Sequence, residues 1–292
     1  MELVQVGEKT YYIKNPTNIG IYKENEKDIW LIDSGNDKDA GKKILKIVEE
    51  NHWNVKGIMN THSHADHIGG NQVIQNRTNC QILCHGIENY FIQSPILEPS
   101  FLYGGYPMDE LQNNKFLMAK ESNVEKIEDH LLKELEYISL KGHSFDMIGI
   151  KTPDDIYFLG DGLISEETIQ KYHIFFLYDV QEYLNTLDML QNLNGKLYIP
   201  SHCEPTDDIS YLIQINRDKI HEIANTILSI CSEPQTFDSL LKALFDHYDL
   251  ILNINQYVLV GNTVKSYLAW LKNNHQIDIF IQDNTLFWKI SH

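Results

Sequence analysis

Four potential metal ligands lie within six consecutive residues, and this spacing constrains the fold and the chemistry of the chain more than any other feature. Residues 61–70 read THSHADHIGG and supply His62, His64, Asp66 and His67. If residues 55–61 form a strand, His62 and His64 point the same way, because side chains two positions apart in an extended chain share a face. Asp66 and His67 would then lie on the turn into a helix. One short segment can thus supply ligands to two adjacent metal ions.

The residue types in this run favour a metal centre. Imidazole nitrogens and carboxylate oxygens are ligands that Zn²⁺ accepts, and a catalytic zinc ion keeps one coordination position for water or substrate. The chain contains 13 histidines, so a histidine-rich surface loop is the alternative. Loops seldom place such residues at a strand-to-helix junction followed by two glycines. We therefore expect a hydrolytic metal site.

Three further candidate ligands each follow an apolar run, as residues at the rim of a buried sheet would. They are His143 in LKGHS, Asp161 in YFLGDG and His202 in LYIPSH. Taken singly, each has an ordinary explanation, because a histidine after a strand is commonly a surface residue and Gly-Asp-Gly is commonly a turn.

Taken together, these residues resemble the signature of the metallo-β-lactamase-fold hydrolase superfamily, which is His-x-His-x-Asp-His followed by a lone His, an Asp and a final His. The resemblance covers residues 1–205. It implies two divalent metal ions, zinc above all, with iron or manganese as alternatives. By this resemblance the first ion is held by His62, His64 and His143, the second by Asp66, His67 and His202, and Asp161 bridges the two.

Departures from the family pattern bear on the subfamily. Asp161 stands where one branch of true β-lactamases carries a cysteine ligand, so the ligand set looks more like that of glyoxalase II, the lactonases and the nucleases of the superfamily. After His143 the chain reads SFDMIG, where relatives commonly have Thr-Pro-Gly, and His202 lies in Ser-His-Cys, where Gly-His-Gly is usual. The ligand assignment carries over, but the shape of the pocket does not.

The N-terminal part predicts an α/β fold. Residues 11–22, 29–33 and 55–61 are expected as strands and 38–50 as an amphipathic helix, which implies sheets covered by helices. The resemblance implies a four-layer αββα sandwich with the metals at one edge between the sheets. It also places Asp33 where the family braces the metal loop through hydrogen bonds, with a plain turn-forming aspartate as the alternative.

Residues 95–116 break this alternation by mixing turn formers and aromatic residues. Long irregular segments inside compact domains are usually functional or mobile. We expect this segment to cover the metal cleft, with Phe101, Tyr103 and Tyr106 contacting substrate. Contact with a second copy, in a homodimer, is the alternative.

The remainder of the chain predicts a separate, mainly helical domain at residues 206–292, after a catalytic domain at residues 1–205. The pattern indicates three helices followed by a hairpin, at 215–231, 236–245, 257–273, 277–281 and 285–290. Such a tail looks like a winged helix and is similar to that of the β-lactamase-like protein 2 branch of the superfamily, which cleaves RNA. The tail is not rich in basic residues, so packing or dimerisation is preferred over nucleic-acid binding.

Charge and composition restrict the partners. The net charge is −17, and Arg77 and Arg217 are the only arginines, which disfavours nucleic acid and anionic membranes as partners. No signal segment and no apolar run of about eighteen residues is recognisable. The four cysteines form no Cys-x-x-Cys pair and suit reduced thiols, so a cytoplasmic location is expected.

The sequence therefore predicts a binuclear metal-dependent hydrolase that attacks a small ester, thioester or lactone through a metal-bridging hydroxide, with Asp66 orienting that hydroxide or handling its proton. No Gly-x-Ser-x-Gly motif and no phosphate-binding loop competes with this scheme. The alternatives are an endoribonuclease or phosphodiesterase, an iron-dependent redox enzyme similar to persulfide dioxygenases, and a non-catalytic metal-bound interaction domain.

Overall fold

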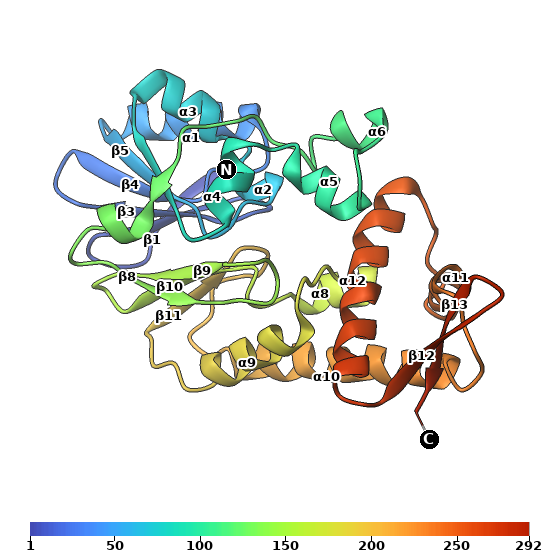
Figure 1. The fold of residues 1–292 in the computed structure, drawn as a ribbon. Helices are drawn as coiled ribbons and strands as arrows, with labels where there is room; N and C mark the ends of the chain where they lie inside the picture. Colours follow the sequence, from blue (N-terminus) through green and yellow to red (C-terminus); the bar gives the residue numbers. More distant parts are fainter. Residues whose placement is uncertain (292) are drawn as a thin grey trace.

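Two stacked sheets with helices on their outer faces form the body of the molecule (Figure 1). The structure is a computed structural model and describes residues 1–291. The first sheet has seven strands in the order β1 to β7, which are Glu2–Gln5, Thr10–Lys14, Ile19–Lys23, Asp28–Ile32, Asn54–Met59, Gln81–Cys84 and Glu125–Lys126. The second has four strands in the order β11-β10-β9-β8, where β8 is Glu136–Ser139, β9 Ile148–Lys151, β10 Ile156–Gly160 and β11 Leu197–Pro200.

Neighbouring side chains along a strand pack into two different layers of the core. In β4, Ile29 and Leu31 pack towards the outer helices, whereas Trp30 and Ile32 pack between the two sheets. Successive side chains of a strand point to opposite faces, so a strand buried on both sides is apolar throughout. The outer helices of the first sheet are α1 (Lys38–Glu50) and α3 (Asn71–Thr78), and those of the second sheet are α9 (Val180–Leu190) and α10 (Ser210–Ile230). The expected αββα sandwich is confirmed.

Two expectations about the first half of the chain were wrong. The run 11–22 is not one strand, because Pro16 lies in a turn that separates β2 from β3, and the two strands pair antiparallel with Ile13 opposite Ile19. The segment 95–116 is not irregular throughout. It contains helices α5 (Leu97–Tyr103) and α6 (Asp109–Gln112).

The remaining short helices connect these strands and precede the C-terminal region. They are α2 (Ala65–Ile68), α4 (Glu88–Gln93), α7 (Ile127–His130) and α8 (Glu166–Tyr172).

The C-terminal region has the predicted order of three helices and a hairpin. After α10 come α11 (Phe237–His247), α12 (Ile254–Asn273), β12 (Ile277–Gln282) and β13 (Thr285–Ile290). Thr236 caps α11 by accepting a hydrogen bond from the backbone N–H of Ser239. Asp283 and Asn284 turn the hairpin with φ of 50° and 58°, which suits residues that tolerate the left-handed region.

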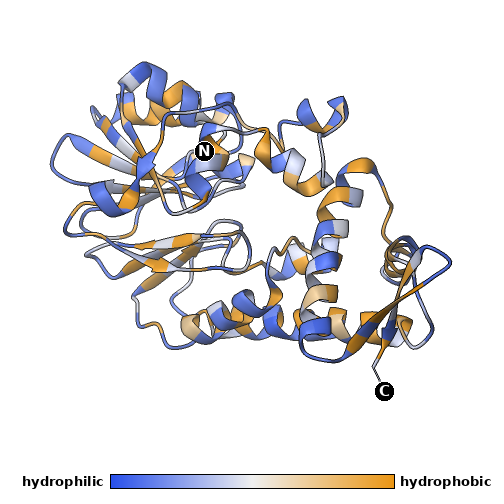
Figure 2. Ribbon diagram, in the orientation of Figure 1, coloured by the Kyte–Doolittle hydropathy of each residue, from blue (hydrophilic) through white to orange (hydrophobic). Residues whose placement is uncertain are grey.

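The C-terminal helices pack on the second sheet and share its hydrophobic core. Ile223 of α10, Leu244 of α11 and Leu268 of α12 belong to the same buried cluster as Leu159 of β10 and Leu187 of α9. Division of the chain at residue 205 and a winged-helix role therefore stay predictions. Polar and apolar residues are interspersed along the helices (Figure 2), and within residues 1–291 no helix has the length and apolarity needed to span a membrane.

Candidate metal centre

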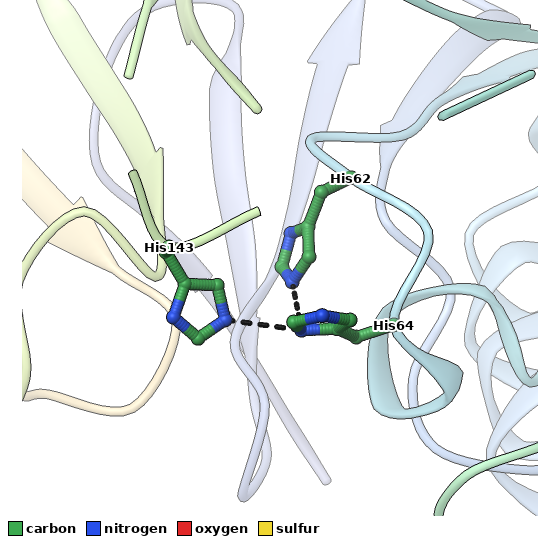
Figure 3. A group of neighbouring side chains, drawn as sticks. All are labelled: His62, His64 and His143. Atoms are coloured by element: carbon green, nitrogen blue, oxygen red, sulfur yellow. Dashed lines mark hydrogen bonds between the residues drawn. The ribbon is translucent and has the colours of Figure 1, made fainter. Parts of the chain in front are cut away.

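The loop between β5 and α2 directs the first ligands to one point. His62 Nε2 and His143 Nε2 each lie 3.0 Å from His64 Nδ1, so three imidazole rings from two loops converge (Figure 3). Close packing fixes these loops. A Cβ on Gly70, after the motif, would lie 2.3 Å from the backbone oxygen of Ser34, and Gly142, before His143, has a φ of +116°.

A second group of ligands lies beside the first. His202 Nε2 is 3.1 Å and His67 Nε2 is 3.6 Å from Asp66 Oδ2. Asp161 stands between the two groups. Its Oδ2 lies 3.3 Å from His143 Nε2, and its Oδ1 lies 3.2 Å from His67 Nε2. All the ligands predicted from the sequence are thus brought together.

For three of the histidines, hydrogen bonds at Nδ1 leave Nε2 as the ligand atom. His67 Nδ1–H donates to Asp33 Oδ2 at 2.8 Å, and His202 Nδ1–H donates to the Pro16 carbonyl oxygen at 2.8 Å. Thr61 Oγ1 donates to Asp33 at 2.8 Å, so it accepts from His62 Nδ1–H at 3.0 Å. Each of these Nε2 atoms, when it carries no proton, can then direct a lone pair towards the centre.

The residues present fit divalent metal ions. His67 Nε2 and Asp161 Oδ1 are buried without a hydrogen-bond partner within residues 1–291, although two acceptors 3.2 Å apart repel each other unless a cation or proton lies between them. Candidate ligand atoms of the predicted residues form three groups of three. Within each group, all the atoms lie within 4.8 Å of one another. The predicted donors are imidazole nitrogens and carboxylate oxygens, which suits zinc, iron or manganese.

The two groups differ in protonation. Burial lowers the pKa of His64 to about 4 and the pKa of His143 to about 3, which leaves both rings neutral and able to bind a cation at neutral pH. Burial also lowers the pKa of His202, but the negative charges of Asp161 and Asp66 outweigh it and raise that pKa to about 9. Metal binding by the second group must therefore release a proton.

The sign of the His202 shift predicts a pH dependence. The folded pKa of about 9 exceeds the ordinary value of 6.5, so the stabilisation from this group is fully present below 6.5 and is lost as pH rises through 9. In metal-stripped protein, the difference in unfolding free energy between wild type and His202→Gln should shrink between pH 6.5 and pH 9.5. Urea titrations across this range measure it. A difference that grows with pH would contradict the assignment.

Asp33 makes the bracing contacts expected of it. Besides its bond to His67, its Oδ1 accepts the backbone N–H of Thr61 at 2.8 Å, and the residue is 1% exposed. It has a φ of 64°, a region that aspartate tolerates better than most residues. It therefore fixes both the metal loop and the orientation of one ligand.

Replacing Asp33 should weaken metal binding without removing a ligand. Asp33→Asn is expected to lower zinc affinity at the second group by about 10- to 100-fold, as measured by titration against a competing chelator. The amide keeps one acceptor oxygen, whereas the carboxylate uses two, one for His67 and one for the N–H of Thr61. Asp207→Asn, an exposed acid, is the matched control. Equal affinities for the two variants would show that the contact is not needed.

Glu88 is a component of the site that the sequence did not reveal. Its Oε2 accepts the backbone N–H of Ser63 at 3.0 Å and also the Ser63 hydroxyl, while its Oε1 accepts the Ser144 hydroxyl at 2.8 Å and the backbone N–H of Asp146 at 3.0 Å. The side chain is fully buried. It joins the loop of His62 and His64 to the loop of His143, where the sequence departs from the family pattern. No local motif marks Glu88, since its partners lie 25 to 58 residues away.

The predicted substrate residues do not line the cavity beside the ligands. Phe101 packs against Phe145 with ring centroids 5.1 Å apart, and Tyr106 is 81% exposed. From the same segment, Glu98 and Phe116 line this cavity instead. Burial, followed by the charge of Glu88, raises the pKa of Glu98 to about 8. A role for Phe101, Tyr103 or Tyr106 in substrate binding stays a prediction.

Comparisons with known proteins agree with this geometry. A family model described as the metallo-beta-lactamase superfamily matches residues 13–202. No curated protein matches the sequence significantly.

Solved structures share the fold. The crystal structure of a beta-lactamase domain protein from Burkholderia ambifaria has a TM-score of 0.75 and 14% identity, covering 99% of this chain and 94% of that chain. A metallo-beta-lactamase family protein from Thermus thermophilus has a TM-score of 0.71 and 16% identity, covering 96% and 98%. The metallo-beta-lactamase SMB-1 has a TM-score of 0.55 and 13% identity, covering 76% and 95%.

Identities this low show a shared fold and do not transfer a substrate. The family model, by contrast, spans the whole ligand set from His62 to His202. The chain belongs to the metallo-beta-lactamase superfamily.

Proposed function

We propose that the protein is a binuclear metal-dependent hydrolase of a small ester, thioester or lactone. The observation that carries this proposal is the position of Asp161, whose two oxygens face His143 at 3.3 Å and His67 at 3.2 Å. Two bound divalent ions, zinc above all, would lower the pKa of a water between them towards about 7 and polarise the oxygen of the scissile bond.

Residues of the chain would position the reactants and move the proton. Asp66 is partly exposed and lines the cavity beside the ligands, so its carboxylate can orient the attacking water and accept its proton. Phe176 lies edge-on to His64 and His143, with ring centroids 5.3 Å and 5.8 Å away, and excludes water from that side of the centre.

Charge favours a small acyl substrate over a polyanion. The chain has a net charge of −17, and one of its two arginines, Arg217, is held by Asp188 at 2.7 Å. Phosphate backbones are usually bound by clusters of Lys and Arg. Two cavities are lined both by predicted ligands and by residues of α12, and no arginine lines either of them.

The test is turnover by the zinc-loaded protein on a panel of thioesters, lactones, phosphodiesters and single-stranded RNA. Asp66→Ala is expected to fold and to lose turnover of the acyl substrates, and Asp207→Ala, an exposed acid, is expected to keep it. Cleavage of RNA that is lost in Asp66→Ala would replace this proposal with a nuclease.

Metal identity tests the redox alternative separately. The protein purified without oxygen is analysed for zinc, iron and manganese and then assayed with each metal. Stoichiometric iron with oxygen-dependent turnover of a persulfide, and no hydrolysis, would overturn the hydrolase proposal. Zinc with no turnover on any substrate would do so as well.

A further inference from the structure

A cavity of about 410 Å³ opens beside two predicted ligands, His64 and Asp66. This size suits a small molecule. Besides the segment of these two ligands, its walls come from three stretches that are distant in sequence: the segment around α5 and α6, the end of α8 with the residues that follow it, and the first turns of α12. Figure 1 shows α5 and α12 side by side, and residues of the two helices are in contact.

The wall formed by α12 is fixed to the opposite wall. Asn114 Nδ2 donates to Asn255 Oδ1 at 2.9 Å across the rim. Val258 of α12 is buried in a cluster with Leu102, Leu111 and Leu117. The C-terminal region therefore forms part of the cavity and is not an appendage remote from the metal centre.

No lysine or arginine lines this cavity. Phe116, Leu117 and Leu259 give it apolar walls, and the carboxyl groups that line it belong to Asp66 and Glu98. Glu98 is 9% exposed, and its carboxyl group makes no hydrogen bond with any group in residues 1–291; its contact with His64 Nε2 is 3.8 Å.

The two lysines that adjoin cavity-lining residues in the sequence do not line this cavity. Lys115, which adjoins Phe116, pairs with Asp37 at 3.3 Å. Lys171 lines the neighbouring cavity, which contains His143, Asp161 and His202.

We propose that this cavity receives the acyl group of the substrate. It accepts an uncharged, largely apolar acyl group and rejects one that ends in a carboxylate. Gln256 of α12 is a position that determines this selectivity. The inference rests on the proposed function and adds the substrate class. A carboxylate entering the cavity would lose water and meet apolar walls with no lysine or arginine to pair with, which costs free energy. Gln256 lines both cavities, so a lysine there would supply the missing cation.

The experiment measures turnover and binding in parallel. Matched ethyl thioesters of hexanoic acid and of adipic acid, whose far end is a carboxylate, are compared by kcat/KM with the zinc-loaded protein. The corresponding N-ethyl amides, which resist hydrolysis, are compared by Kd in zinc-loaded and in metal-stripped protein, where a carboxylate has no metal to bind. Wild type is expected to favour the uncharged member at least about tenfold in both measurements.

Two variants separate a local effect from the net charge of the protein. Gln256→Lys should reduce or reverse the preference, whereas Gln282→Lys, an exposed residue of the hairpin, should leave it unchanged. Equal binding of the two amides by wild type, binding of neither, or equal effects of the two variants would overturn the inference. Failure of all thioester turnover with the binding preference intact would refute the proposed hydrolase activity while leaving the selectivity of the cavity supported.

Discussion

Replacing Asp161 by alanine is expected to reduce turnover at least about a thousandfold and to leave no more than one tightly bound metal ion per chain. The residue is 6% exposed, with Oδ2 at 3.3 Å from His143 Nε2 and Oδ1 at 3.2 Å from His67 Nε2. Its loss takes a ligand from both groups and leaves three imidazoles of the first group as the stronger remaining site. A thousandfold loss corresponds to about 4 kcal/mol of transition-state stabilisation, which is within the range supplied by metal ions.

The measurement is metal content after dialysis, together with kcat/KM on the best substrate found. Asp207→Ala is the control for removing an exposed acid, and circular dichroism verifies the fold. Retention of two ions with turnover within tenfold of wild type would show that Asp161 does not bridge two metals.

Replacing Glu88 by alanine is expected to lower the free energy of unfolding by about 3–5 kcal/mol. Glu88 accepts four hydrogen bonds while fully buried, and its removal leaves the N–H groups of Ser63 and Asp146 and the hydroxyls of Ser63 and Ser144 without their partner. A buried donor that loses its acceptor still bears the cost of leaving water, and no hydrogen bond offsets that cost any longer. Metal affinity at the first group should fall too, since these bonds hold the loop of His62 and His64 against the loop of His143.

Urea unfolding of metal-stripped protein, followed by tryptophan fluorescence, measures the stability change apart from metal binding. Glu88→Gln keeps an acceptor oxygen and should be less destabilising than Glu88→Ala. Glu110→Ala, at an exposed position, should stay within about 0.5 kcal/mol of wild type. A loss below about 1 kcal/mol for Glu88→Ala would mean that water replaces the carboxylate.

Much of the metal centre was predictable because four of its candidate ligands lie within six consecutive residues. His62, His64, Asp66 and His67 lie on one strand-to-helix junction, where backbone geometry alone limits their directions. The other predicted ligands end apolar runs, and strand ends of a buried sheet meet at one edge. The helix cap at Thr236 and the hairpin turn at Asp283 and Asn284 were equally local.

The roles of Glu88 and Glu98, which depend on partners distant in sequence, were not predicted. Glu88 bonds to Asp146 at a distance of 58 residues in the chain, and Glu98 meets a cavity wall that α12 supplies. In the segment around α5, the aromatic residues suggested substrate contacts, but the helix turns Glu98 and Leu102 inwards and leaves Tyr103 41% exposed. The direction of a side chain on a short helix depends on what packs against that helix, which hydrophobic spacing does not specify.

The sequence by itself determined the types of ligand and the alternation of strands and helices in the first part of the chain, because these follow from the chemistry of imidazole and carboxylate groups and from backbone periodicity. Its resemblance to the superfamily predicted the arrangement of the ligands and the αββα frame. The tertiary structure alone decided that Glu88 joins two loops and that α12 forms one wall of a cavity lined by no lysine or arginine. The physical reason is that these contacts depend on how two sheets and a C-terminal helix stack. Stacking is settled by the burial of many side chains at once and not by any local run of residues.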